Sequence, residues 1–145
     1  MKRLIITMLV LLSACQKPDF YDVNGRGYLY ADLEEKWQLV NYWATWCGPC
    51  RKEIPEFNEI ANDFAEAVVV FGVNFEPVDR ATNQEHIDKM GIEFPVYAED
   101  PYEYFNVDRP AVLPTTIIIS PGGEVHVVLI GPQTRETLLA AIGLD

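Results

Sequence analysis

Apolar residues occur in short blocks, and the composition of four blocks predicts strands. The runs at 37–43 (WQLVNYW), 67–75 (AVVVFGVNF) and 115–119 (TTIII) are rich in β-branched and aromatic residues, as buried strands are. The run at 124–130 follows Gly122-Gly123, a dipeptide typical of a tight turn, and therefore predicts the return strand of a hairpin. These four runs predict the sheet of a single domain.

Three helices are predicted between and after these strands. From 48 to 64, apolar residues recur at three- and four-residue spacing. A second helix is expected to open at Thr82, because Thr82-Asn83-Gln84-Glu85 has the form of a capping box, and to end at Gly91. The last helix is expected to begin at Pro132 or Thr134.

Weaker patterns predict a short strand at 94–97 and a helical turn at 101–105. The expected order is strand, helix, strand, helix, strand, then a hairpin and a final helix. Crossover helices of this kind connect parallel strands. We therefore expect a three-layer α/β domain, with a mixed central sheet and helices on both faces.

The first fourteen residues have the pattern of an export signal. A basic start, Met1-Lys2-Arg3, precedes an apolar run at 4–12 that is shorter than the twenty or so residues of a membrane span. Leu12-Ser13-Ala14-Cys15 resembles the lipobox of bacterial lipoproteins, in which cleavage precedes a cysteine that then carries the lipid. The alternative is an ordinary signal peptide cut after Ala14, with Cys15 as a free thiol.

Cleavage before Cys15 would leave a strongly acidic chain. Without Lys2 and Arg3, nine basic residues face 22 acidic ones, which gives a net charge of −13. This charge argues against partners such as nucleic acid or an anionic lipid surface. Residues 16–27 show little periodicity and predict a tether from Cys15, at most roughly 40 Å long. Residues 28–145 form the expected domain.

Cys47 and Cys50 carry the clearest chemistry in the sequence. Cys47 follows a predicted strand and opens a predicted helix, where free N–H groups and the helix dipole lower the pKa of a thiol. Cys50 lies three residues further on, on the same side of the first turn, and Pro49 is tolerated early in a helix. An exposed nucleophile beside a covered second thiol is the arrangement that disulfide exchange requires.

Other uses of the cysteine pair have less support. A zinc site needs about four ligands, and the remaining candidates, His86 and His126, lie far apart in the sequence without ligand-spaced partners. A purely structural disulfide across so short a loop stabilises little. A peroxidatic cysteine would have Thr three residues and Pro seven residues before it, and Ala44 and Val40 stand there instead.

Residues 43–55, W-A-T-W-C-G-P-C-R-K-E-I-P, resemble the active site of the thioredoxin superfamily. The R-K-E-I-P continuation is most similar to the TlpA/ResA-like branch of bacterial envelope proteins. Leu113-Pro114-Thr115, directly before a predicted strand, resembles the cis-proline loop of the superfamily. The resemblance covers roughly residues 28–143. It implies a thioredoxin-like fold with the extra strand–helix insertion of that branch, within 75–100, and a redox-active disulfide between Cys47 and Cys50.

The resemblance implies three catalytic residues, Cys47, Cys50 and Glu53. Cys47 is the expected nucleophile, Cys50 resolves the mixed disulfide, and Glu53 is a carboxylate with a raised pKa that serves Cys50 as a base. Superfamily members usually carry an aspartate six residues before the first cysteine, whereas this chain has Asn41, which cannot titrate. The alternative for Glu53 is an acid that merely stabilises the helix N-terminus.

Substrate-binding residues are implied on both sides of the cysteine pair. They are Trp46, Gly48, Pro49, Leu113 and Pro114. With a cis peptide bond before Pro114, the backbone of Leu113 would pair with an extended substrate chain beside the disulfide. We expect Trp46 to be exposed and Trp43 to lie in the core.

The expected function is that of a lipid-anchored thiol–disulfide oxidoreductase that reduces disulfides of bacterial envelope proteins. The Gly48-Pro49 dipeptide resembles that of reducing thioredoxins rather than that of strong oxidases. Electrons would come from a membrane thiol-transfer protein, and apocytochrome c is one candidate substrate. No metal or cofactor is expected, and the chain is expected to act as a monomer.

Two other functions stay open at this point. One is a disulfide oxidase or isomerase, which a measured reduction potential would separate from a reductase. The other is a lipid-anchored binding module, such as a metal chaperone, whose thiols do not turn over. For the location, Gln16 stands where an aspartate would signal inner-membrane retention in many enteric bacteria, so the outer membrane is favoured.

Overall fold

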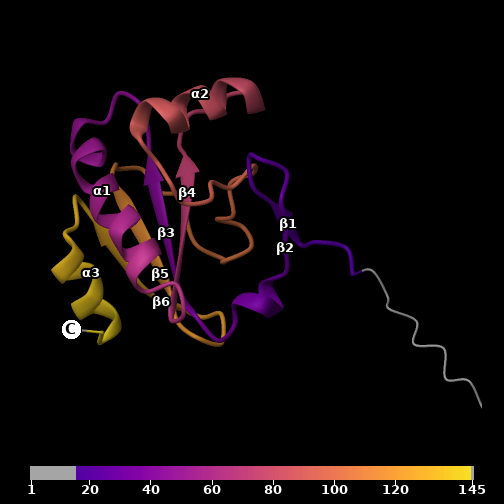
Figure 1. Cartoon of the computed structure of the whole chain (residues 1–145), viewed down its shortest axis with the longest axis vertical. Coiled ribbons are helices and arrows are strands. Elements are labelled where there is room, and N and C mark those ends of the chain that lie inside the picture. Colours follow the sequence, from indigo (N-terminus) through magenta and orange to yellow (C-terminus); the bar gives the residue numbers. More distant parts are fainter. Residues whose placement is uncertain (1–15, 145) are drawn as a thin grey trace, which may run out of the picture.

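A four-stranded mixed sheet forms the centre of the computed structural model, which describes residues 16–144 (Figure 1). The strand order is β4-β3-β5-β6, with β3 and β4 parallel and the other pairs antiparallel. The bounds are β3 Trp37–Trp43, β4 Val68–Asn74, β5 Thr115–Ile119 and β6 Val125–Ile130. All four predicted strands are therefore confirmed, with ends that shift by one residue at most.

Three α-helices follow the strands as the sequence predicts. They are α1 Gly48–Asp63, α2 Arg80–Met90 and α3 Arg135–Ile142. The start of α2 differs from the prediction, because Asp79 caps it by accepting hydrogen bonds from the backbone N–H groups of Ala81 and Thr82. Thr134 caps α3, as one of the two predicted starts requires. Within residues 16–144, no helix is both long and apolar enough to cross a bilayer.

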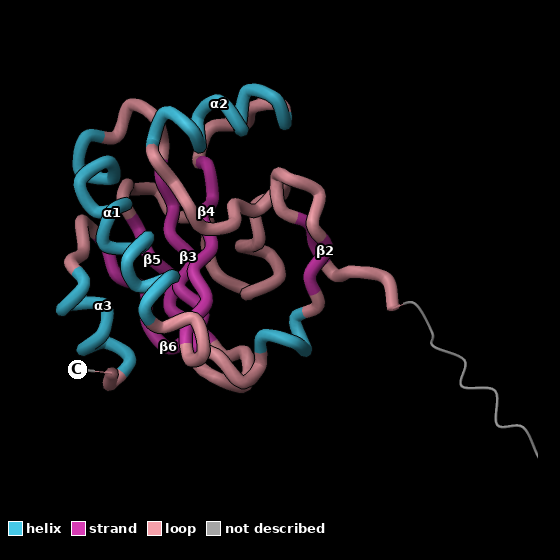
Figure 2. The backbone as a smooth tube through the Cα atoms, in the orientation of Figure 1, coloured by secondary structure: helices cyan, strands magenta, loops and turns pink. Residues whose placement is uncertain are grey.

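The two faces of the sheet are covered differently. Buried residues of α1, α2 and α3 belong to one apolar cluster with Leu39 and Ile118, and Figure 2 shows α1 and α3 together on one side of the sheet. The opposite face carries Val40, Tyr42 and Phe71. It is covered by a 3-10 helix, η1 (Tyr30–Leu33), and by residues of irregular segments such as Tyr97 and Phe105. The predicted helical turn at 101–105 is confirmed, since the backbone N–H of Phe105 donates to the carbonyl of Pro101 at 3.2 Å, but no α-helix of the described residues covers this second face.

The predicted tether at 16–27 differs from the structure from Asp19 onward. β1 (Phe20–Tyr21) and β2 (Gly27–Tyr28) form a small antiparallel hairpin, seen beside the sheet in Figure 1. The ring of Phe20 stacks on Tyr28 at 5.1 Å and meets the edge of Phe71 at 5.5 Å. This aromatic contact holds the hairpin against the second face of the sheet. Strands of two residues are too short to show a period in the sequence.

The insertion expected within 75–100 is present but only partly regular. It contains α2, and the predicted strand at 94–97 reduces to isolated bridges, Val96 with Gly72 and Tyr97 with Asp22. Gly72 is constrained at this bridge, because a Cβ there would lie 2.8 Å from Nε1 of Trp43. Trp43 is completely buried, as predicted. The bridge thus adds one parallel pairing beyond β4.

Candidate active site at the cysteine pair

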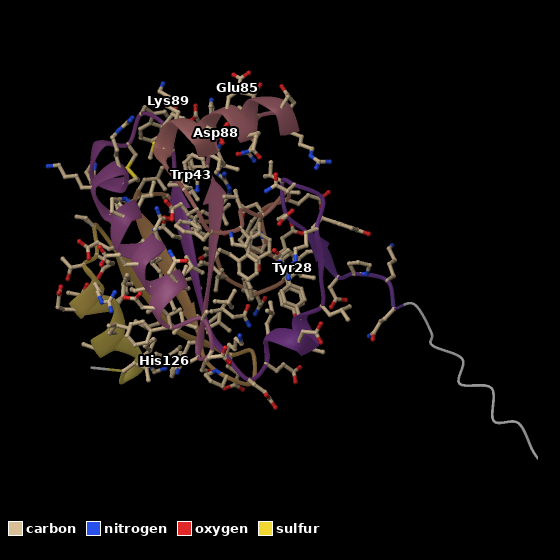
Figure 3. All side chains as sticks on the ribbon, in the orientation of Figure 1. Tyr28, Trp43, Glu85, Asp88, Lys89 and His126 are labelled. Carbon is tan, nitrogen blue, oxygen red and sulfur yellow. A yellow bond between two sulfur atoms is a disulfide. The ribbon has the colours of Figure 1, made fainter. Side chains whose placement is uncertain are left out.

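Cys47 and Cys50 form a disulfide where β3 leads into α1. Their Cα atoms are 5.3 Å apart, and Figure 3 shows the yellow sulfur–sulfur bond beside the start of the helix. Cys47 is the N-cap of α1, and its Sγ accepts a hydrogen bond of 3.2 Å from the backbone N–H of Cys50. Cys47 keeps 4% of its surface exposed and Cys50 none. Both residues are therefore buried, Cys47 is the more accessible of the two, and a backbone donor is aimed at its sulfur.

Glu53 lies one turn beyond Cys50 on the buried side of α1 and is only 1% exposed. Its Oε1 accepts a hydrogen bond of 2.7 Å from Nδ2 of Asn41, and its Oε2 accepts one of 2.8 Å from the backbone N–H of Gln133. Burial raises the pKa of Glu53 to about 7, against the lowering effect of these two hydrogen bonds. A buried carboxyl that titrates near neutral pH thus lies behind the cysteine pair.

Asn41 connects Glu53 to the middle of the sheet. It lies on β3 directly opposite Thr116 of β5, and its Nδ2 also contacts Oγ1 of Thr116 at 3.2 Å. Both residues are completely buried. Oδ1 of Asn41 is buried too and has no hydrogen-bond partner within residues 16–144. The sequence shows that Asn41 cannot titrate but does not reveal its contact with Thr116, because no sequence pattern links two residues that are 75 positions apart.

A second carboxylate holds the loop that precedes Cys47. Oε2 of Glu76 accepts hydrogen bonds from the backbone N–H of Thr45 at 3.3 Å and from its Oγ1 at 3.0 Å. Nδ1 of His86, on α2, lies 3.6 Å from the same oxygen. From the other side, the guanidinium of Arg51 donates to the carbonyl of Thr45 at 2.9 Å. Glu76 comes two residues after β4, a place where sequence alone gave no reason to assign it a role.

Among the predicted substrate-binding residues, Trp46 is exposed as expected, and Pro114 is buried. Trp46 is 65% exposed, and Gly48 and Pro49 are exposed at the start of α1. The peptide bond between Leu113 and Pro114 is cis, which confirms that prediction. Leu113 packs against the apolar cluster that contains both cysteines. Trp46, Gly48 and Pro49 are therefore exposed next to the cysteines in the chain, and their role in binding stays a prediction.

The histidines weighed as metal ligands have other surroundings. Nδ1 of His86 lies 3.1 Å from Nδ2 of Asn74, and His126 on β6 packs edge-on against Trp37. Within residues 16–144, no group of three or more His, Cys, Asp or Glu side chains is arranged to hold a metal ion. The described part of the chain thus contains no set of side chains that would form the zinc site considered above.

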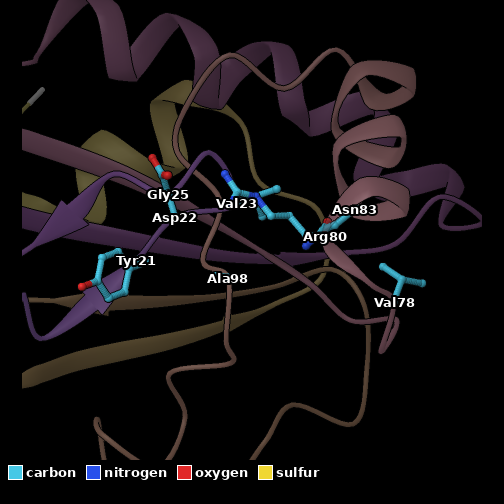
Figure 4. Close-up of a pocket in the computed structure, with 8 residues that line it drawn as sticks. All are labelled: Tyr21, Asp22, Val23, Gly25, Val78, Arg80, Asn83 and Ala98. Atoms are coloured by element: carbon cyan, nitrogen blue, oxygen red, sulfur yellow. The ribbon is translucent and has the colours of Figure 1, made fainter.

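A pocket of about 380 Å³ lies between the β1–β2 hairpin and α2. Figure 4 shows Arg80 and Asn83 of α2 opposite Val23 and Gly25 of the hairpin. Neither cysteine nor Glu53 lines it, so it is separate from the redox site.

Known proteins that are similar to this chain include thiol-disulfide oxidoreductases and thioredoxin-like proteins, in agreement with the disulfide found at the start of α1. A model of the AhpC/TSA family matches residues 14–128. The thiol-disulfide oxidoreductase ResA of Geobacillus kaustophilus is 30% identical over 125 residues, which cover 83% of this chain and 71% of that protein. The thioredoxin-like protein YneN of Bacillus subtilis is 29% identical over 90% of this chain and 78% of its own. A thioredoxin-family thiol:disulfide interchange protein from Chlorobium tepidum superposes with a TM-score of 0.68, at 27% identity, over 86% of this chain and 89% of its own.

Proposed function

The chain belongs to the AhpC/TSA family and is a thiol–disulfide oxidoreductase with a thioredoxin-like fold, and on this basis we propose that it reduces disulfides in other proteins. The observation that carries the proposal is the disulfide-forming pair at the start of α1. The carboxyl of Glu53, whose pKa is about 7, is buried one turn after Cys50. In this proposal the nucleophile Cys47 caps α1, and the resolving thiol Cys50 and the base Glu53 lie near the start of the same helix.

The reaction begins with both thiols reduced. The Cys47 thiolate attacks one sulfur of the substrate disulfide, which breaks that bond and releases the other substrate sulfur as a thiolate. The Cys50 thiolate then attacks the Cys47 sulfur of the mixed disulfide and releases the second substrate thiol. The substrate gains two electrons, and Cys47 and Cys50 are oxidised to the disulfide. The N–H of Cys50 that points at the Cys47 sulfur supports the role of Cys47, because it stabilises a thiolate there.

Glu53 accepts the proton of Cys50 in this proposal. Cys50 has no exposed surface, so water cannot readily take its proton. Glu53 lies three residues further along the same buried face of α1, where its carboxyl has a pKa of about 7. A base whose pKa is near the working pH is best suited to accept and return a proton.

Substrate would bind across the exposed residues around the disulfide. Trp46, next to Cys47 in the chain, offers an exposed apolar ring, and Gly48 and Pro49 on the other side of Cys47 are exposed as well. Leu113 and Pro114 would present backbone to an extended substrate segment. Among their neighbours, Val112 is 54% exposed, which extends the apolar surface beside the cis bond.

We further propose a lipid anchor at Cys15 and a place in the bacterial envelope. Cys15 and the predicted signal lie outside the described residues, and support comes from the lipobox-like sequence alone. Because the hairpin begins at Asp19, only residues 16–18 would separate the lipid from the folded domain. The domain would then lie close to its membrane. Gln16 favours the outer membrane, and electrons would reach Cys47 and Cys50 from a membrane thiol-transfer protein.

Catalysed reduction of insulin by dithiothreitol tests the proposed function. We expect the full chain to accelerate it and Cys47→Ser to abolish the acceleration. Cys50→Ser, the matched control, should keep the nucleophile and trap a mixed disulfide with a substrate protein. A chain that binds a metal through its reduced thiols but gives no acceleration would instead be a binding module.

A further inference from the structure

Asn41 lies between Glu53 and Thr116, and only one end of its amide group has hydrogen-bond partners. Its Nδ2 is 2.7 Å from Oε1 of Glu53 and 3.2 Å from Oγ1 of Thr116. Its Oδ1 is buried and accepts no hydrogen bond from any described residue. A buried acceptor without a partner is unfavourable and rare, and here it means that no hydrogen bond at Oδ1 fixes the amide in one orientation.

We propose that the Asn41 amide is a positioning group that follows the protonation state of Glu53, turning by half a rotation when Glu53 takes up a proton. With Glu53 ionised, Nδ2 donates to the carboxylate, as in the structure. With Glu53 protonated, the turned amide presents Oδ1 to the new O–H. This inference rests on the proposed function, in which Glu53 receives the proton of Cys50.

The observed distances suit both orientations. Exchange of the two amide atoms would place Oδ1 about 2.7 Å from Oε1 of Glu53, a normal length for an O–H···O hydrogen bond. The hydroxyl of Thr116 accepts from Nδ2 in the first orientation and donates to Oδ1 in the second, because a hydroxyl can do both. Only the amide and hydroxyl torsions have to change.

Protonation of Glu53 decides between the two orientations. In either one, an end of the amide is left without a partner, so that penalty does not select one of them. The contact with Glu53 selects the orientation. A carboxylate strongly favours an N–H donor, whereas a carboxylic acid favours a carbonyl acceptor. An aspartate at position 41 could not act in this way, because it would compete for the proton.

The groups that contact Glu53 are uncharged, so no neighbouring charged side chain takes part in the exchange. Gln133 contributes a backbone N–H, and Asn41 and Thr116 have no ionisable group. The pKa of Glu53 is set by burial and by these hydrogen bonds, not by a charged side chain. Before it in the sequence, Cys47 and Cys50 are buried and take part in the proposed reaction, whereas the charged side chains of Arg51 and Lys52 on α1 are exposed.

Nuclear magnetic resonance of the reduced full chain, with labelled asparagine and glutamate side chains, observes the exchange directly. As the pH rises, we expect the Asn41 amide resonances to move with the same midpoint as the Glu53 carboxyl carbon. In the oxidised chain the two groups should again titrate together. Asn41 resonances that stay constant while Glu53 titrates would overturn the inference.

The rate of thiol–disulfide exchange against pH gives an independent test. Asn41→Ala removes one of the two hydrogen bonds that lower the pKa of Glu53, so the midpoint of the profile should rise by about one pH unit. Thr116→Val should shift the midpoint in the same direction, and Thr116→Ser should restore it. A merely structural role would lower stability or the overall rate and leave every midpoint in place.

Two further variants separate the possible failures. If Cys47→Ser retains activity, the proposed function is wrong, and this inference falls with it. If Glu53→Gln keeps the wild-type midpoint, Glu53 is not the base, and the inference is overturned while the function stands. If Glu53→Gln loses the midpoint but Asn41→Ala and Thr116→Val keep it, only the role of Asn41 is wrong. Should Asn41→Ala fail to fold, Thr116→Val decides.

Discussion

The backbone N–H of Gln133 donates a hydrogen bond of 2.8 Å to Oε2 of Glu53, across 80 positions of sequence. This contact joins the segment before α3 to the buried side of α1. Together with the 2.7 Å contact from Asn41, it gives each carboxylate oxygen of Glu53 a donor. The protein thus holds a buried carboxyl in place behind the disulfide while burial keeps its pKa in the neutral range.

Glu53 should make folding stability depend on pH. Its pKa is about 7 in the folded protein against 4.5 for an ordinary glutamate, so between these values the folded chain binds more protons than the unfolded chain. Stability is therefore lost as the pH rises from about 4.5 through 7, by roughly 3 kcal/mol in total. The test uses the oxidised chain, in which the cysteines do not titrate. The unfolding free energy of wild type in urea, minus that of Glu53→Gln, should decrease by this amount as the pH rises. A pH-independent difference would contradict it.

Glu76 should affect exchange through the position of the loop before Cys47. Glu76→Ala removes the acceptor for both donors of Thr45, and we expect about 1 kcal/mol lower stability and roughly 2- to 10-fold slower exchange. Glu76→Gln keeps an acceptor oxygen and serves as the matched control, with a smaller effect. Equal rates in wild type and Glu76→Ala would show that this contact does not position the nucleophile.

Two tryptophans three residues apart should respond to substitution in opposite ways. Trp46→Ala removes an exposed ring, so the unfolding free energy should change by less than about 0.5 kcal/mol while reduction of protein substrates slows. Trp43→Ala empties a completely buried site and should cost about 3–5 kcal/mol. Urea unfolding and substrate kinetics separate the two effects. Unchanged kinetics in Trp46→Ala would remove Trp46 from the proposed substrate surface.

Phe20 should contribute to stability as part of the folded domain. Phe20→Ala removes stacking on Tyr28 and an edge contact with Phe71, and we expect a loss of about 2 kcal/mol. Tyr21→Ala, on the exposed side of the same strand, is the control and should change stability by less than about 0.5 kcal/mol. If both variants unfold like wild type, this segment behaves as the tether that the sequence pattern suggested.

Strong periodic patterns and local chemistry were predictable from the sequence. The buried strands β3 and β5 and the helix α1 appear where β-branched runs and helical spacing placed them. Asp79 competes with Thr82 as the cap of α2, and it prevails because its carboxylate accepts from two backbone N–H groups. Propensity rules rank both residues as good caps, so the choice depends on geometry.

The partners of the site residues were not predictable in the same way. Glu53 could be singled out because it matches a glutamate of the TlpA/ResA-like branch, but its contacts with Gln133 and Asn41 come from other elements. Only the folded sheet brings Thr116 opposite Asn41. The hairpin at Phe20 was missed for a similar reason, since its stability comes from distant aromatic rings rather than from local pattern.

The reduction potential of the Cys47–Cys50 pair tests the central proposal most directly. The full chain is equilibrated with glutathione buffers of known potential, and the fraction oxidised is read by thiol alkylation, with Cys50→Ser as the control without a disulfide. A reductase should have a potential between about −200 and −270 mV, in the range of glutaredoxins and thioredoxin. A potential near −120 mV, the level of the oxidase DsbA, would contradict the proposal and identify a catalyst of disulfide formation.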